Sequence, residues 1–188
     1  MNSTRFIFVR HGETDWNARG VFQGRSDVQL NETGRQQARD AAALLKERGV
    51  NHVISSPLSR ALETAMTIAK ACDCKVEVEH DLIECDFGSL EGGSIASAMQ
   101  KAGLDRKDQL PSIVPVDGEA WGEVRQRALR ALSTHLSAKL DALIVFVGHD
   151  AVVQAMAEQL CGAWFDSKHG IPYEFERDEQ MWVVRQIE

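Results

Sequence analysis

Two histidines come directly after apolar segments that are typical of buried strands. His11 follows RFIFV and Arg10, and His149 follows LIVFV and Gly148. Ligands of open α/β sheets bind beyond the carboxyl ends of the strands, so both imidazoles would reach one crevice if these strands are neighbours. A single histidine at a strand end is more often a hydrogen-bonded structural residue, but two of them in equivalent places favour a catalytic site.

Two arginines indicate that the crevice binds a phosphate group. Arg10 precedes His11, and Arg60 lies in the first turn of a predicted helix, where its charge opposes the helix dipole unless an anion is bound there too. Helix N-termini offer unpaired N–H groups, and a guanidinium offers a planar fork of donors that suits phosphate oxygens. The alternative for Arg60 is a surface position in which it pairs with Glu63.

A bound phosphate would let His11 act as a nucleophile. Phosphoryl transfer depends mainly on positioning and on neutralising the charge of the phosphate oxygens, so a neutral imidazole suffices for the attack. The departing alkoxide then needs a proton from another group. The segment LIECDFG offers Glu84 and Asp86 for this. Glu84 is the candidate acid, and Asp86 is interpreted as a solvated loop charge.

The elements that must position these residues alternate between short apolar strands and longer helices. Strands are predicted over 5–9, 52–55, 75–79, 143–147, 171–175 and 180–187, and helices over 35–48, from 56 onward, over 120–139 and over 151–160. Asn31 is the predicted N-cap of the first helix, and Ser56-Pro57 the predicted N-cap and first residue of the second. This order predicts an α/β fold with helices on both faces of a sheet, which the tail closes as an edge or a hairpin around a charged turn at 176–179.

The chain length and composition predict one domain over residues 1–188. Residues 92–117 mix glycines, prolines and scattered charges, and we interpret them as an excursion from the sheet in which substrate specificity could lie. The formal charge of −7 argues against a sequence-independent nucleic-acid binder. The composition gives no indication of the oligomeric state.

Neither a membrane span nor a metal or disulfide framework is indicated by the sequence. No apolar run approaches the roughly 20 residues of a membrane helix, and FIFV is shorter than the about 7 residues of a secretory segment, so we expect a cytoplasmic protein. Four cysteines form no C-x-x-C pair and are expected to be reduced and structural: Cys72, Cys74, Cys85 and Cys161.

These segments together resemble the histidine phosphatase superfamily, in the branch that includes cofactor-dependent phosphoglycerate mutases and many small phosphatases. The resemblance is carried by VRHGETDWN (9–17), FQGRSD (22–27), LNETGRQQA (30–38), SSPLSRALETA (55–65), LIE (82–84) and VGH (147–149). It implies a three-layer sandwich with a mostly parallel central sheet and an antiparallel edge, and no metal or other cofactor.

The resemblance also implies a role for each matching residue. His11 would be phosphorylated, and Glu84 would donate the proton. Arg10, Arg60 and His149 would form the phosphate pocket, which Asn17, Gln23 and Gly24 would line.

Two departures from the family pattern affect these roles. Asp150 follows His149 where glycine is usual, similar to the acid-phosphatase branch in which that aspartate donates the proton, so Asp150 is a rival to Glu84. Phosphoglycerate mutases that resemble this chain carry an arginine directly after the acid glutamate, and this chain has Cys85. The second departure favours a phosphatase over a mutase.

The sequence therefore leads to one main hypothesis and three alternatives. The main hypothesis is a metal-independent phosphatase that acts on small phosphate monoesters through a phosphohistidine on His11. The alternatives are a mutase with the same chemistry, a phosphate-binding regulatory module without turnover, and a metal site formed by His11, Glu13 and Asp15. Both arginines would repel a metal cation, and nothing in the sequence identifies the substrate.

Overall fold

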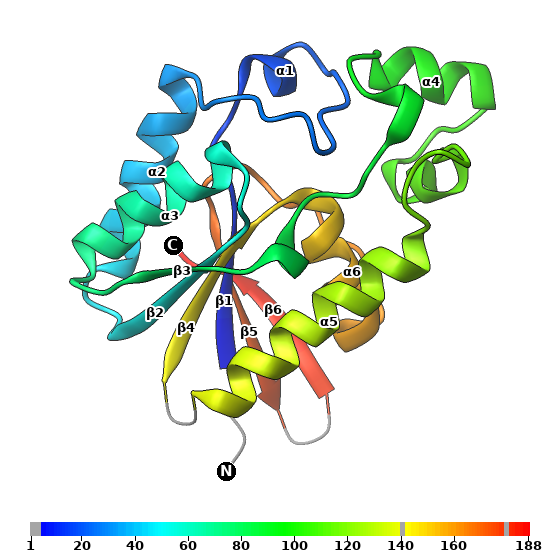
Figure 1. The fold of residues 1–188 in the computed structure, drawn as a ribbon. Coiled ribbons are helices and arrows are strands. Elements are labelled where there is room, and N and C mark those ends of the chain that lie inside the picture. Colours follow the sequence, from blue (N-terminus) through cyan, green and yellow to red (C-terminus); the bar gives the residue numbers. More distant parts are fainter. Residues whose placement is uncertain (1–4, 140–141, 179–180) are drawn as a thin grey trace.

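A six-stranded sheet forms the centre of the fold (Figure 1). The computed structural model describes residues 5–139, 142–178 and 181–188. The strands are β1 (Arg5–Arg10), β2 (Val50–Ser55), β3 (Val76–Val78), β4 (Leu143–Gly148), β5 (Pro172–Asp178) and β6 (Met181–Gln186). Their order is β3-β2-β4-β1-β5-β6; the first four are parallel, and β5 and β6 add an antiparallel edge.

Helices cover both faces of the sheet, as the resemblance implied. The α-helices are α1 (Asp15–Ala18), α2 (Glu32–Leu45), α3 (Ser59–Ala71), α4 (Ile95–Ala102), α5 (Trp121–Ala138) and α6 (Asp150–Cys161). Short 3₁₀ turns span His80–Leu82, Gly88–Leu90 and Lys107–Ile113. In Figure 1, α2 and α3 lie on one side of the sheet and α5 and α6 on the other. No helix in the described ranges is long and apolar enough to cross a membrane.

Successive side chains of β1 and β4 point alternately to the two faces of the sheet and contribute to a hydrophobic core on each face. Ile7 and Val145 pack with α2 and α3, whereas Phe6 and Phe146 pack with α5 and α6. Successive side chains of a strand point to opposite faces, so a central strand that is apolar throughout supplies two cores at once. All of these side chains are fully buried.

Most predicted elements are present within a few residues of their predicted bounds. The predicted N-cap is also confirmed, because the side chain of Asn31 accepts a hydrogen bond from Gly34 N at 2.8 Å. Residues 92–117 lie outside the sheet and contain α4 and a 3₁₀ turn.

Two predicted boundaries are wrong. The helix predicted from Ser56 begins only at Ser59, because the Ser56 side chain is used elsewhere: it contacts the His149 imidazole, and its oxygen accepts from Leu58 N at 3.3 Å. The charged turn predicted at 176–179 is mostly strand, since β5 continues to Asp178 in register with β6. Residue 179 lies outside the described residues.

A close backbone crossing fixes the loop that carries His11. A Cβ atom on Gly12 would lie 2.2 Å from the Gly34 carbonyl oxygen, and one on Gly34 would lie 2.1 Å from the Glu13 carbonyl oxygen. Only two glycines let the loop after β1 and the first turn of α2 approach so closely. The N-terminus of α2 therefore supports the backbone of the histidine loop.

We expect Gly34→Ala to destabilise the protein by about 1–3 kcal/mol, because the added methyl group forces the two backbones apart. Thermal unfolding should show a fall in Tm of about 2–4 °C for each kcal/mol. The control is Gly122→Ala at an exposed position of α5, where an added Cβ meets nothing within 4 Å. That change should stabilise the helix by about 0.4–1 kcal/mol. Equal Tm values for the two variants would contradict the crossing as a constraint.

Candidate active site

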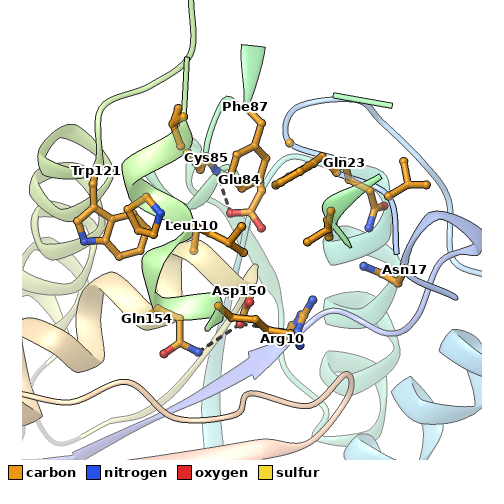
Figure 2. Close-up of a pocket in the computed structure, with 18 of the residues that line it drawn as sticks. Arg10, Asn17, Gln23, Glu84, Cys85, Phe87, Leu110, Trp121, Asp150 and Gln154 are labelled. Atoms are coloured by element: carbon orange, nitrogen blue, oxygen red, sulfur yellow. Dashed lines mark hydrogen bonds and ion pairs between the residues drawn. The ribbon is translucent and has the colours of Figure 1, made fainter. Parts of the chain in front are cut away.

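A cleft of about 730 Å³ opens beyond the carboxyl ends of β1 and β4 (Figure 2). The sequence-predicted site residues that line it are Arg10, His11, Asn17, Gln23, Gly24, Arg60 and Glu84. The two histidine-bearing strands are direct neighbours, with Arg10 opposite Gly148, and His11 N donates to the Gly148 carbonyl at 2.9 Å. This adjacency brings the His11 and His149 rings to a centroid distance of 5.1 Å.

The hydrogen bonds of His11 fix its tautomer. Nδ1 lies 2.7 Å from the Gly12 carbonyl oxygen, which can only accept, so Nδ1 carries the proton. Arg60 Nε donates to Nε2 at 3.2 Å, so Nε2 presents its lone pair. Burial, followed by the charge of Arg60, holds the pKa of His11 well below its ordinary value. A neutral imidazole with Nε2 as its free base is the form that can act as a nucleophile.

Arg60 is fully buried, which excludes the surface position paired with Glu63. Its guanidinium donates to the Ser26 carbonyl at 2.9 Å and to the Gly24 carbonyl at 2.8 Å. Glu63 instead pairs with Arg35 at 2.8 Å. The guanidinium of Arg60 therefore lies between the loop 24–26 and His11.

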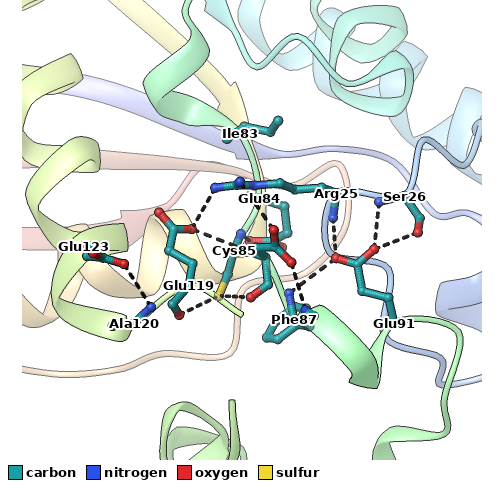
Figure 3. A network of polar contacts seen from close by, with 12 residues as sticks. Arg25, Ser26, Ile83, Glu84, Cys85, Phe87, Glu91, Glu119, Ala120 and Glu123 are labelled. Atoms are coloured by element: carbon teal, nitrogen blue, oxygen red, sulfur yellow. Dashed lines mark hydrogen bonds and ion pairs between the residues drawn. The ribbon is translucent and has the colours of Figure 1, made fainter. Parts of the chain in front are cut away.

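Glu91 holds that loop in place (Figure 3). One oxygen of its carboxylate accepts from Arg25 N at 2.9 Å and from Phe87 N at 3.3 Å. The other oxygen accepts from Ser26 N at 3.1 Å and from Ser26 Oγ at 2.7 Å. Since the carbonyl groups of this loop orient Arg60, Glu91 is a positioning residue for the guanidinium.

Two buried polar atoms indicate where an anion would bind. Among the described residues, the buried side-chain nitrogens Arg10 Nε and His149 Nδ1 lack a hydrogen-bond partner. His149 Nε2 lies 2.7 Å from Ser56 Oγ, and Arg10 donates to the Ser167 carbonyl at 2.9 Å, so both side chains are fixed by their other nitrogens. Unsatisfied buried polar atoms cost about 1–3 kcal/mol each, which a bound oxyanion would offset.

The pKa values of the two rival carboxyl groups are shifted in opposite directions. Burial raises the pKa of Glu84 to about 7, although its carboxylate accepts from Cys85 N at 2.8 Å. Burial also tends to raise the pKa of Asp150, but the charge of Arg10 and hydrogen bonds from Ser167 and Gln154 outweigh it and lower that pKa. Glu84 can carry a proton at neutral pH, and Asp150 is ionised.

Two neighbours of His11, His169 and Thr64, were not predicted from the sequence. His169 Nδ1 lies 3.0 Å from the His11 carbonyl oxygen, and burial together with the charge of Arg10 lowers the pKa of His169 to about 4. Thr64 Oγ1 accepts from Gly12 N at 3.2 Å. His169 follows no strand, and Thr64 sits inside a helix, so no local sequence pattern marks either residue.

The metal hypothesis finds no support in the described part of the chain, where no three His, Cys, Asp or Glu groups are placed to hold a metal ion. The Glu13 carboxylate instead accepts from the Asn31 side chain at 3.0 Å. Cys72, Cys74, Cys85 and Cys161 are free thiols, as predicted, and burial raises the pKa of Cys85.

Comparison with known proteins agrees with the resemblance stated from the sequence. The profile of the family described as the histidine phosphatase superfamily (branch 1) matches residues 6–174. The chain is 33% identical over 166 residues to the probable phosphoglycerate mutase GpmB of Salmonella arizonae, covering 85% of this chain and 77% of GpmB. It is 38% identical over 149 residues to the bifunctional protein Rv2228c of Mycobacterium tuberculosis, covering 78% of this chain and 41% of that protein.

A solved structure shares the fold over nearly its whole length. Phosphoserine phosphatase from Entamoeba histolytica, in complex with 3-phosphoglyceric acid, superposes with a TM-score of 0.81 at 26% identity. The superposition covers 99% of this chain and 98% of that one. Sequence relatives therefore include probable mutases, and a structural neighbour is a phosphatase.

We expect Glu91→Gln to weaken the binding of inorganic phosphate about tenfold. The amide nitrogen that replaces one carboxylate oxygen cannot accept from the backbone N–H groups, so the loop 24–26 and Arg60 lose their fixed geometry. Isothermal titration calorimetry measures this Kd. Glu47→Gln, an exposed position just beyond α2, removes the same charge and should bind phosphate as the unmodified protein does. Equal affinities in both variants would remove Glu91 from the site.

Proposed function

Because the chain belongs to the histidine phosphatase superfamily, branch 1, we propose that it is a phosphatase of small phosphate monoesters that acts through a phosphohistidine on His11. The observation that carries this proposal is the orientation of His11. Its Nε2 lone pair faces Arg60 in a cleft that also contains a carboxyl group able to hold a proton, Glu84. Arg10, Arg60 and His149 would bind the phosphate oxygens, and Asn17, Gln23 and Gly24 would line the pocket.

In the first step, His11 Nε2 attacks phosphorus while the bond from phosphorus to the ester oxygen breaks. Glu84 gives its proton to the departing alkoxide. In the second step, water gives a proton to the Glu84 carboxylate and attacks the phosphohistidine. The phosphorus–nitrogen bond breaks, its electron pair returns to Nε2, and phosphate leaves. Arg10 and Arg60 neutralise the oxygens throughout.

The mutase alternative has the names of relatives in its favour, but the cleft supports it less. Where mutases that resemble this chain carry an arginine, Cys85 is buried, and its Sγ faces the carbonyls of Asp86 and Glu119. The regulatory alternative would require the negative charge of Asp150 to disfavour an anionic intermediate. Arg10 lies 3.6 Å from the Asp150 carboxylate and offsets that charge, so Asp150 is compatible with turnover.

We expect the protein to release phosphate from monoesters at an unchanged rate in EDTA, and His11→Ala to reduce release to the uncatalysed background. The measurement is phosphate release from a panel of sugar, nucleoside, glycerol and aryl phosphates. His80→Ala, at an exposed histidine, should retain full activity. Turnover by His11→Ala, or loss of wild-type turnover in EDTA, would refute the proposed mechanism.

Acid catalysis by Glu84 predicts the pH profile. The protonated form is the active one, so kcat/KM should fall as the pH rises through about 7. A bound phosphate dianion disfavours a second negative charge, so the corresponding fall in kcat should lie at higher pH. Steady-state rates across the pH range measure both.

Glu84→Gln should reduce kcat/KM for alkyl phosphates by about 10²–10⁴-fold. It should reduce kcat/KM for 4-nitrophenyl phosphate much less, because 4-nitrophenolate leaves without a proton in the step that kcat/KM reports. Asp150→Asn serves as the comparison: through Arg10 it should slow both substrates by similar factors. The reverse pattern, with leaving-group dependence in Asp150→Asn alone, would make Asp150 the acid.

A further inference from the structure

Two aromatic pairs line the cleft in addition to the phosphate-binding groups. Phe22 and Phe87 meet at a ring distance of 5.0 Å, and Trp121 and Trp164 stack at 5.2 Å with an interplanar angle of 28°. The four rings come from four separate segments: the loops after α1 and Glu84, the start of α5 and the segment after α6. Aromatic surface from distant parts of the chain therefore converges on one cleft.

The excursion 92–117 adds further apolar surface. Leu110, Pro111 and Val114 line the cleft from the 3₁₀ turn and the residue after it. Figure 2 shows Leu110 and Trp121 on the side of the cleft opposite Asn17. The leaving group of a substrate would lie against this surface once the phosphate is bound.

Two polar side chains on the tryptophan side, Trp121 and Gln154, already have protein partners. Trp121 Nε1 donates to the Glu158 carboxylate at 2.8 Å. The Gln154 amide donates to the Phe165 carbonyl at 2.7 Å and accepts from Phe165 N at 3.2 Å. Hydroxyl groups of a leaving group placed against these two side chains would lose water without gaining hydrogen bonds from them, at about 1–3 kcal/mol for each unsatisfied group.

Apart from the two arginines, the cleft offers little positive charge to an acidic leaving group. Among the described lining residues, Lys107 is the cation beyond Arg10 and Arg60, and the anionic Asp150 lies on the same lining. The further cations Arg19 and Lys168 border an adjoining groove that shares Arg10 and Lys107 with the cleft. A second anion would have to extend into that groove.

We propose that the substrates of this cleft are monoesters of apolar, ring-bearing alcohols. The proposal rests on the proposed phosphatase function and assigns its specificity to the Trp121–Trp164 pair together with Leu110. The phosphate group supplies the recognition common to all monoesters. The apolar wall selects among them by burying the alcohol, at about 25 cal/mol for each Å² removed from water.

The first test compares kcat/KM for benzyl phosphate, glycerol 3-phosphate and 3-phosphoglycerate, all esters of alcohols that need a proton to leave. Benzyl phosphate should be preferred at least tenfold. Leu110→Asn and Trp164→Ala should each reduce that preference several-fold, and Val116→Ala, at a fully exposed residue of the excursion, should not change it. Equal or faster turnover of glycerol 3-phosphate or 3-phosphoglycerate would overturn the assignment and leave the phosphatase function standing.

The second test measures binding without turnover. Benzylphosphonate and 3-phosphonopropionate carry a stable carbon–phosphorus bond, and calorimetry gives their Kd values directly. Tenfold tighter binding of benzylphosphonate supports the apolar site, whether or not any ester is hydrolysed. If no ester is hydrolysed, the phosphatase function is refuted and the apolar site is not. Tighter binding of 3-phosphonopropionate would refute the apolar site and indicate a substrate carboxylate in the adjoining groove.

Discussion

The rest of the site depends on the hydrogen bonds that the buried guanidinium of Arg60 makes. A charge removed from water is costly unless its donors are satisfied, and here they go to two carbonyl groups and to His11 Nε2. The contact with Nε2, together with the Gly12 carbonyl at Nδ1, fixes the tautomer of His11, and burial followed by the charge of Arg60 lowers its pKa. Glu91 holds the loop 24–26 in the geometry that places two carbonyl acceptors at Arg60. An incoming oxyanion would meet a guanidinium already held in position, so little ordering remains to be done on binding.

Different environments shift the pKa values of the two carboxyl groups in opposite directions. Glu84 and Asp150 line the same cleft, yet Glu84 is buried with one backbone donor, and Asp150 lies near Arg10 and accepts from Ser167 and Gln154. Desolvation dominates in the first case, and charge with hydrogen bonding dominates in the second. One carboxyl group is thereby suited to hold a proton, and the other to hold an arginine.

The cleft combines a strongly polar end with apolar walls, and the two come from different parts of the fold. The groups proposed to bind phosphate follow the parallel strands and begin helices, where backbone geometry is tightly constrained. The aromatic and aliphatic walls come mainly from loops, the excursion 92–117 and helix ends. Loops tolerate change better than strands do, so a fold of this kind can keep its reaction and vary its substrate.

The sequence by itself determined the strands, most helices and the two histidines at the strand ends, because alternation, capping and strand-end positions are local patterns. Asn31, His11 and His149 are examples. Asn17, Gln23 and Gly24 came from the resemblance to the family. The start of α3 and the partners of Arg60 were decided only by tertiary structure, since Ser56 contacts His149 across the sheet instead of capping its own helix. The different pKa shifts of Glu84 and Asp150 also depend on tertiary structure, because a pKa depends on burial and on neighbours distant in sequence. The apolar wall gave no signal along the chain, since Trp121 and Trp164 become neighbours only when α5 and α6 pack together.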